Sequence, residues 1–255
     1  MYLKTHIRVV AALLIREMST RFGSRPGGYI WALVDPASYI ILLTVIFQAI
    51  ARHPALGTSF PLFYASGYLA FQFYIAVASY VGSALGANKA LLSYPNVAPF
   101  DTVVARFILQ FGTTAFVACI VVGVISLGLY HPLRLDWPPI IEASLAASLL
   151  ALGVALSNTV LFRAWPIYES VYAIISKPLM LVSGVFFLPG SLPDPFREIV
   201  LLNPLAHVII LFRTGFYPEY RAGGYSAPYL YAFVTASLFI GMTLFSASTK
   251  LLRNE

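Results

Sequence analysis

Two long stretches of this chain contain no charged side chain, and they limit what it can fold into more than any other feature. Thirty-six residues without Asp, Glu, Lys or Arg separate Arg52 from Lys89, and 27 separate Arg106 from Arg134. A helix needs about 20 mostly apolar residues to cross a bilayer, so both stretches are long enough. Only 10% of the 255 residues are charged, against about 25% in an ordinary soluble domain. The sequence therefore predicts an all-α polytopic membrane protein.

The apolar segments predict six transmembrane helices within one domain, residues 1–255. The predicted spans are 29–50, 60–85, 103–130, 140–162, 168–188 and 228–249. A seventh apolar stretch, 199–212, is too short to span and is interrupted at Asn203-Pro204. We expect a broken re-entrant or interfacial helix pair there, within an outer segment 189–227 that lies between spans five and six.

Lysine and arginine counts predict the orientation of these spans. With a cytoplasmic N-terminus, the inner segments hold eleven of the sixteen basic residues and the outer segments hold five. The excess of basic residues inside places both termini in the cytoplasm. The net charge of +6 is spread along the span flanks, so it indicates topology rather than a nucleic-acid partner.

The N-terminal segment 1–28 has an amphipathic pattern. At 100° per residue an apolar stripe occupies one face and most of the charged residues lie on the other; the stripe is Leu3, Ile7, Val10, Leu14 and Met18. We expect a helix lying in the inner membrane interface. Gly23, Gly27 and Gly28 follow it and predict a hinge into the first span, whereas a short first spanning helix is the competing interpretation.

The remaining residues exclude several classes of function. Ion-coupled carriers keep ionisable groups inside their spans, but here the charged residues of the spans lie near predicted span ends. The four histidines are dispersed, the single cysteine Cys119 lies in an apolar run, and no GxxxxGK[ST] phosphate-binding loop is present. The residues alone leave two interpretations open: a channel or structural membrane subunit, or the membrane half of a pump driven by a separate ATPase.

Two further patterns bear on function. Residues 88–92, between spans two and three, can form a short cytoplasmic helix that receives a push from a partner, although a plain hairpin turn fits equally. Span two carries an aromatic stripe, which is a suitable lining for a glycan path because rings pack on sugar C–H faces. Helix packing or an interfacial belt explains the same stripe. The candidates for this path are Phe60, Tyr64, Tyr68, Phe71 and Tyr74.

Four blocks of the sequence resemble the membrane subunits of type-2 ABC exporters, and most closely the capsular polysaccharide export permeases of Gram-negative bacteria. The blocks are "LIREMSTRFGSRPGGYIWALVDP", "GANKALLSYPNVAPFDTVVAR", "KPLMLVSGVFFLPGSLP" and "LLNPLAHVIILFRTGFYPEY". The resemblance implies a bacterial inner-membrane homodimer that exports a lipid-anchored capsular polysaccharide. It also implies a separate cytoplasmic ATPase that binds ATP and Mg. This chain would bind no cofactor and no metal, and would have no catalytic residue.

The resemblance also implies partners and contact residues. It implies a periplasmic co-polymerase or adaptor and an outer-membrane polysaccharide export protein, besides membrane lipids. The residues implied to dock the ATPase are Arg16, Glu17, Arg21, Arg25, Asn88, Lys89, Leu91, Leu92, Tyr94 and Pro95, with 163–170 as a lesser contact. Asn203, Pro204 and His207 are candidates for an outer gate. An exporter of O-antigen or another lipid-linked glycan, and a non-transporting membrane scaffold, are the alternatives.

Overall fold

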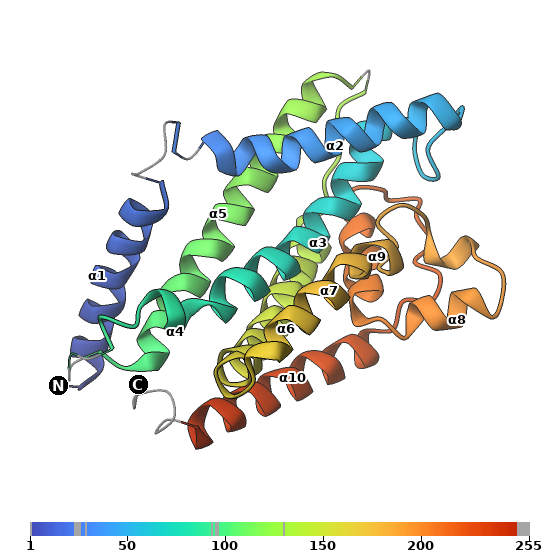
Figure 1. Ribbon diagram of the computed structural model, residues 1–255. Helices are drawn as coiled ribbons and strands as arrows, with labels where there is room; N and C mark the ends of the chain where they lie inside the picture. The colour runs from blue at the N-terminus through green and yellow to red at the C-terminus, as the bar shows by residue number, and fades with distance from the viewer. Residues whose placement is uncertain are drawn as a thin grey trace.

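The computed structural model of the chain describes residues 2–22, 27–28, 30–92, 94, 97–129 and 131–248. Every regular element in these ranges is a helix (Figure 1). In chain order they are α1 (Tyr2–Phe22), α2 (Ile30–Ile50), α3 (Phe60–Gly82), α4 (Ala84–Ala87), α5 (Pro99–Leu127), α6 (Trp137–Ala164), α7 (Pro166–Val182), the 3₁₀ turn η1 (Pro189–Ser191), α8 (Phe196–Leu201), α9 (Pro204–Thr214) and α10 (Ala227–Ala247).

Five of these helices are long and apolar enough to cross a membrane: α2, α3, α5, α6 and α10. The expected all-helical membrane protein is therefore confirmed at this level. The predicted fifth span, 168–188, is shorter than expected, because α7 has 17 residues and ends at Val182. Gly184 adopts a φ of +82° there, and a left-handed residue ends a helix. At 1.5 Å per residue α7 is about 26 Å long, somewhat less than the roughly 30 Å hydrocarbon core.

Helix α3 lies at the centre of the molecule and contacts α2, α5, α6 and α9. Its first turn is fixed by Ser59, whose hydroxyl accepts a hydrogen bond from the backbone N–H of Leu62 at 3.4 Å. Most of its residues are buried by the surrounding helices. Helix α3 is therefore the element against which the others are positioned.

Small residues bring α6 and α10 into close contact. A Cβ atom built on Gly241 of α10 would lie 2.3 Å from the carbonyl oxygen of Gly153 on α6. Small residues allow such close backbone approach in membrane helices, so these two glycines define the crossing.

The apolar stretch 199–212 is broken where the sequence predicts. Helix α8 ends at Leu201, and α9 begins at Pro204, with the side chain of Asn203 accepting from the N–H of Leu205 at 3.0 Å. Most of α9 is buried among the other helices. Its apolar composition thus reflects packing inside the protein.

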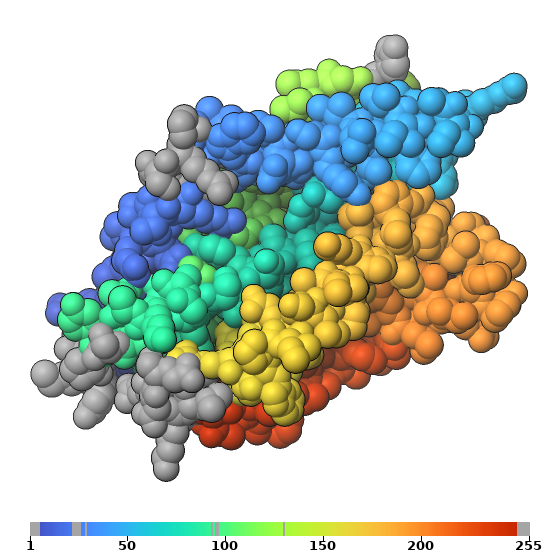
Figure 2. All heavy atoms as spheres, in the orientation of Figure 1, coloured from blue at the N-terminus to red at the C-terminus, as the bar shows by residue number. Residues whose placement is uncertain are grey.

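The helix ends sort into two groups. Figure 1 shows that α1 and α5 begin, and α3 and α10 end, toward one end of the bundle, while α8 and α9 lie toward the other. Helix α7 is different, since none of its residues is buried and it lies on the surface of the face shown in Figure 2.

Candidate functional site

A buried polar cluster centred on Glu17 joins α1 to α3, α5 and the loop after α4. The Glu17 carboxylate accepts hydrogen bonds from Arg106 Nε at 2.9 Å, from Asn88 Nδ2 at 2.7 Å and from the Tyr80 hydroxyl at 2.7 Å. Burial opposes ionisation of Glu17, but the hydrogen bonds from Arg106, Asn88 and Tyr80 outweigh it, so its pKa lies below the ordinary value. Glu17 is therefore an anion held by three donors.

Two arginines share the ring of Tyr80 in this cluster. The guanidinium carbons of Arg21 and Arg106 lie 4.2 and 4.5 Å from the ring centroid. Arg106 also donates to the backbone oxygen of Tyr80 and to Ser83 Oγ, both at 3.0 Å. Cation–π contacts of this kind strengthen as the cation is desolvated. Arg106 lies near the start of α5 and is buried there, with its charge neutralised by Glu17.

Further contacts fix the orientation of α1 along α5. His6 Nδ1 lies 3.0 Å from Asp101 Oδ1, and Arg21 Nη1 donates to Gln110 Oε1 at 2.6 Å. Only part of the apolar stripe lies at this interface, because Val10 and Leu14 are half-buried whereas Ile7 and Met18 are exposed. The side of α1 that faces the protein thus combines the buried Glu17 with the buried Leu13.

Of the two interpretations of residues 88–92, a short helix and a plain hairpin turn, the structure has turns. The helix is one turn earlier, at Ala84–Ala87, and residues 88–92 form hydrogen-bonded turns. Asn88 accounts for the turns, since its side chain donates back to the oxygen of Ala84 at 3.0 Å and accepts from Arg16 Nη1 at 2.7 Å. We call residues 88–92 the docking loop.

The residues proposed to dock the ATPase fall into distinct groups. Glu17 and Asn88 are only 5% and 1% exposed and face the chain itself. Exposed residues are Arg16, Lys89 and Tyr94, while Arg21, Leu91 and Leu92 are half-buried. Arg25 and Pro95 lie outside the described residues. Residues 163–170 comprise the end of α6, the exposed Trp165 between the helices, and the first residues of α7.

The expected glycine hinge is partly described. Gly27 and Gly28 have φ values of +87° and +36°, a region that favours glycine. The N–H of Ile30 donates to the oxygen of Gly27 at 2.7 Å, which closes a turn just before α2. Gly23 lies outside the described residues. The two described glycines therefore form a turn, and their action as a hinge stays a prediction.

The aromatic stripe on α3 is buried within the protomer. Tyr68 stacks on Tyr39 of α2 with ring centroids 4.6 Å apart, and Tyr64 lies 5.0 Å from Phe47 of α2. The five path candidates are all buried: Phe60, Tyr64, Tyr68, Phe71 and Tyr74. In this conformation α2 covers the first half of the stripe, and contact of these rings with a glycan stays a prediction.

A polar cavity of about 150 Å³ lies beside Tyr68, between α1, α2, α3 and α5. Its wall includes Arg21 and Asp35 together with amide and hydroxyl groups from Gln72, Gln110, Thr113 and Thr114. Gln72 donates to the Tyr68 hydroxyl at 2.5 Å. The cavity thus links the aromatic stripe to the polar side of α1.

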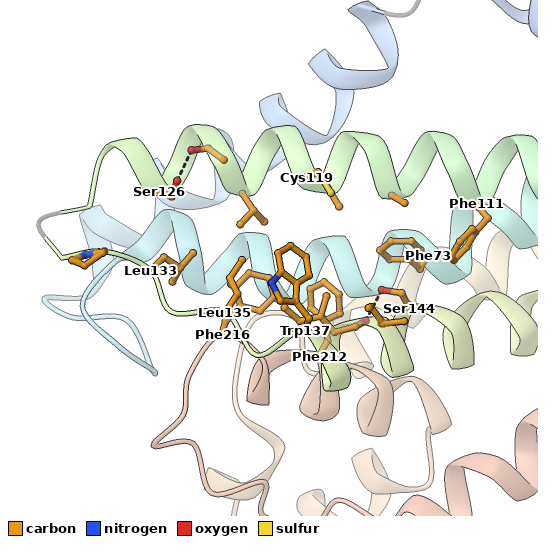
Figure 3. Close-up of a pocket in the computed structure, with 17 residues that line it drawn as sticks. Phe73, Phe111, Cys119, Ser126, Leu133, Leu135, Trp137, Ser144, Phe212 and Phe216 are labelled. Atoms are coloured by element: carbon orange, nitrogen blue, oxygen red, sulfur yellow. Dashed lines mark hydrogen bonds between the residues drawn. The ribbon is translucent and has the colours of Figure 1, made fainter.

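A larger cavity of about 540 Å³ is almost entirely apolar (Figure 3). It lies between α5, α6, α9 and the segment that precedes Trp137, with Phe73 of α3 in its wall. The hydroxyls of Ser126 and Ser144 bond to the oxygens of Gly123 and Ile140 of their own helices, as the dashed lines in Figure 3 show. Little polar capacity remains for a sugar, so this cavity suits an apolar group.

The outer-gate candidates are part of a buried junction. His207 Nε2 donates to the oxygen of Leu201 at 2.9 Å, and its Nδ1 accepts from the N–H of Ser226 at 3.1 Å. This arrangement requires a neutral imidazole. Burial lowers the pKa of His207, although the bond to Leu201 opposes that shift. Asn203 and Pro204 fix the start of α9 as described above, and His207 connects α8, α9 and α10.

Among the described residues Arg213 is the most deeply buried charge, and it lies in the predicted outer segment 189–227. It is 0% exposed and donates to the carbonyl oxygens of Gly184, Val185 and Phe187 at 2.7–3.0 Å. Its guanidinium carbon also lies 4.4 Å from the ring centroid of Phe63. Arg213 therefore fixes the turn that follows α7.

Sequence reasoning also missed Gln72, Gln110 and Ser148, which are polar residues within apolar helices. Such residues are costly in a membrane and usually face the bundle interior. Their positions in long uncharged stretches were the available signal. They lie beside the polar cavity or, for Ser148, donate to the oxygen of Phe73 at 3.3 Å.

The described part of the chain is thus an all-helical bundle, with a polar cluster at one end and a broken, buried helix at the other. Residues 8–217 match the ABC-2 type transporter model, so the chain belongs to the ABC-2 type transporter membrane family. Among curated relatives it is 32% identical to the polysialic acid transport protein KpsM of Escherichia coli, over 92% of each chain.

Two further relatives have related names. The capsule polysaccharide export inner-membrane protein CtrC of Neisseria meningitidis serogroup A is 28% identical, over 83% of this chain and 80% of its own length. The capsule polysaccharide export inner-membrane protein BexB of Haemophilus influenzae is 24% identical, over 93% of this chain and 89% of its own. The similarity therefore extends over most of the helical bundle.

Proposed function

We propose that this chain is the permease subunit of an ABC exporter that moves capsular polysaccharide across the inner membrane. The observation that carries the proposal is the similarity, over four-fifths or more of each chain, to three proteins named for polysialic acid or capsule polysaccharide export. Five helices long and apolar enough to span a membrane support the role of a membrane subunit.

The energy for export comes from a separate ATPase that docks at the end of the bundle holding α4. The sequence has no phosphate-binding loop of its own, and the exposed side chains of Lys89 and Tyr94 offer a contact surface there. The starts of α1 and α5 and the end of α10 lie at that same end. Basic residues in these inner segments support a cytoplasmic location for it and for both termini.

The functional unit is a homodimer. Two helices present apolar side chains that nothing in the protomer covers, among them Ile41 and Val45 of α2 and Ile174 and Leu181 of α7. A second copy covers part of these faces, with lipid covering the rest. Helix α7 serves as the predicted fifth span within this assembly, which brings the total to six. A periplasmic adaptor and an outer-membrane export protein receive the polysaccharide, which travels on a lipid anchor.

Transport by inside-out vesicles tests the function. Vesicles that contain this chain and its ATPase should take up labelled capsular polysaccharide only when ATP is present, and vesicles lacking either subunit should not. Uptake of an O-antigen-type glycan instead, or ATP hydrolysis with no polysaccharide uptake, would contradict the proposed substrate.

Co-purification tests the docking surface separately. Replacing Leu91 and Leu92 with Asp should abolish co-purification with the ATPase, because two carboxylates would replace apolar contacts, while membrane insertion persists. Leu202→Asp, an exposed position at the opposite end, is the matched control and should retain the ATPase. Equal recovery of the ATPase with both variants would remove the docking assignment.

A further inference from the structure

The carboxylate of Glu17 connects parts of the chain that are distant in sequence. Its hydrogen-bond partners are Arg106, which lies 89 residues away on α5, Asn88, which lies 71 away in the docking loop, and Tyr80 near the end of α3. Glu17 is on α1 and is 5% exposed. One side chain thus holds α1, α3, α5 and the docking loop together.

The charges in this cluster depend on each other. Glu17 is the carboxylate that contacts Arg106, and Arg21 shares the Tyr80 ring with that arginine. A buried ion that loses its partner is strongly unfavourable. Loss of the Glu17 charge would leave two guanidinium groups against one ring, so the elements carrying them would separate or admit water.

The docking loop begins at the cluster. Asn88 donates to Glu17 Oε1 and accepts from Arg16 Nη1, and its backbone oxygen accepts from the N–H of Leu91 at 2.9 Å. A displacement of residues 88–92 is therefore passed directly to α1. Arg106 passes the same displacement to α5 through Glu17.

We propose that Glu17 and Arg106 are positioning residues, which make α1, the docking loop and the start of α5 move as one unit when the ATPase pushes on the loop. This inference assigns Glu17 and Asn88 to transmission within the chain rather than to contact with the ATPase. It rests on the proposed function only in naming the ATPase as the source of the push.

Distance measurements between two spin labels test the rigid unit without any cargo. The labels are placed on exposed sites, Ser19→Cys on α1 and Ala90→Cys in the docking loop, with Cys119→Ser removing the native thiol. The full complex with its ATPase is measured with and without ATP. We expect one narrow distance that ATP does not change, because both labels belong to the same unit.

Glu17→Gln is the critical variant, because it keeps the shape and most hydrogen-bonding capacity while removing the charge. It should broaden the label distance and reduce transport per ATP hydrolysed by about tenfold or more, as expected when a buried pair loses one member. Arg8→Gln on the exposed side of α1 is the matched control and should change neither quantity. The Glu17→Gln, Arg106→Gln double variant should recover part of the loss, since no buried charge of the pair is left alone.

Several results would overturn the inference. One is a narrow, unchanged distance in Glu17→Gln together with normal transport per ATP. Another is a wild-type distance that changes when ATP binds, and a third is a Glu17→Gln defect that lowers protein yield but leaves the transport-to-hydrolysis ratio intact. Failure of wild-type vesicles to move polysaccharide would instead refute the proposed substrate, while the label distances would still decide the role of Glu17.

Discussion

Replacing Gly241 with alanine should destabilise the protein, because the crossing of α6 and α10 has no room for a methyl group. The added Cβ would lie 2.3 Å from the oxygen of Gly153 and 3.0 Å from Leu156 Cβ. An ordinary carbon–oxygen contact is about 3.3 Å, so the helices must separate by about 1 Å. The obstacle is backbone, which cannot rotate away as a side chain can.

The size of the effect follows from this geometry. Overpacking typically costs about 1–3 kcal/mol, and a gap of up to about 1 Å also forfeits a quarter to a half of the dispersion contact at each affected atom pair. The better helix propensity of alanine stabilises α10 by about 1 kcal/mol at most. With about 2–4 °C per kcal/mol for a chain of this size, we expect the midpoint of thermal unfolding to fall by several degrees.

Thermal unfolding in detergent, followed by the loss of the monodisperse peak in size-exclusion chromatography, measures this change. Gly112→Ala on α5 is the matched control, because nothing lies within 4 Å of the added Cβ, and it should keep or raise the midpoint. If Gly241→Ala is as stable as Gly112→Ala, the close crossing is not what holds α6 against α10.

Three other changes have defined outcomes. Arg213→Met should lower the free energy of unfolding by about 2–4 kcal/mol, since the oxygens of Gly184, Val185 and Phe187 lose their donor; chemical unfolding measures it. The depressed pKa of His207 means that the unfolded state binds the proton first, so stability should fall as the pH drops below about 6.5. His207→Gln should flatten that dependence, which thermal melts across pH detect. Tyr68→Phe keeps the stack on Tyr39 and, if the stripe contacts glycan, should slow export about fivefold, the equivalent of one hydrogen bond of about 1 kcal/mol; unchanged export would favour packing alone.

Hydrophobicity made most of the fold predictable. Long apolar stretches predicted the positions of α2, α3, α5, α6 and α10 to within a few residues at most ends. The Asn203-Pro204 pair predicted the break between α8 and α9, because Asn caps a helix and Pro opens one. These features are local, so a single sequence contains them.

The helix ends that were missed depend on side chains that act at short range. The sequence left a short helix and a plain turn equally open for the docking loop, and the Asn88 side chain, which bonds to Ala84 and Arg16, decides for turns. Helix α7 was extended to 188, although Gly184 with its positive φ ends it earlier. Asn88 and Gly184 were visible in the sequence. However, Arg16, the partner of Asn88, is 72 residues away, and the positive φ of Gly184 is known only from the structure.

The partnership between Glu17 and Arg106 could not be predicted, because hydropathy treats each charge as an isolated cost. An unpaired arginine on α5 argues for a span that begins later, and an unpaired glutamate on α1 argues for an exposed surface. Together they satisfy each other at 2.9 Å, with Asn88 and Tyr80 completing the shell of the carboxylate. Pairing offsets the cost of burying each charge, and it holds the Glu17 side of α1 against the protein. The same arrangement leaves Ile7 and Met18 exposed, so α1 is held by the rest of the chain on one side and carries exposed apolar residues elsewhere, as expected of an interfacial helix.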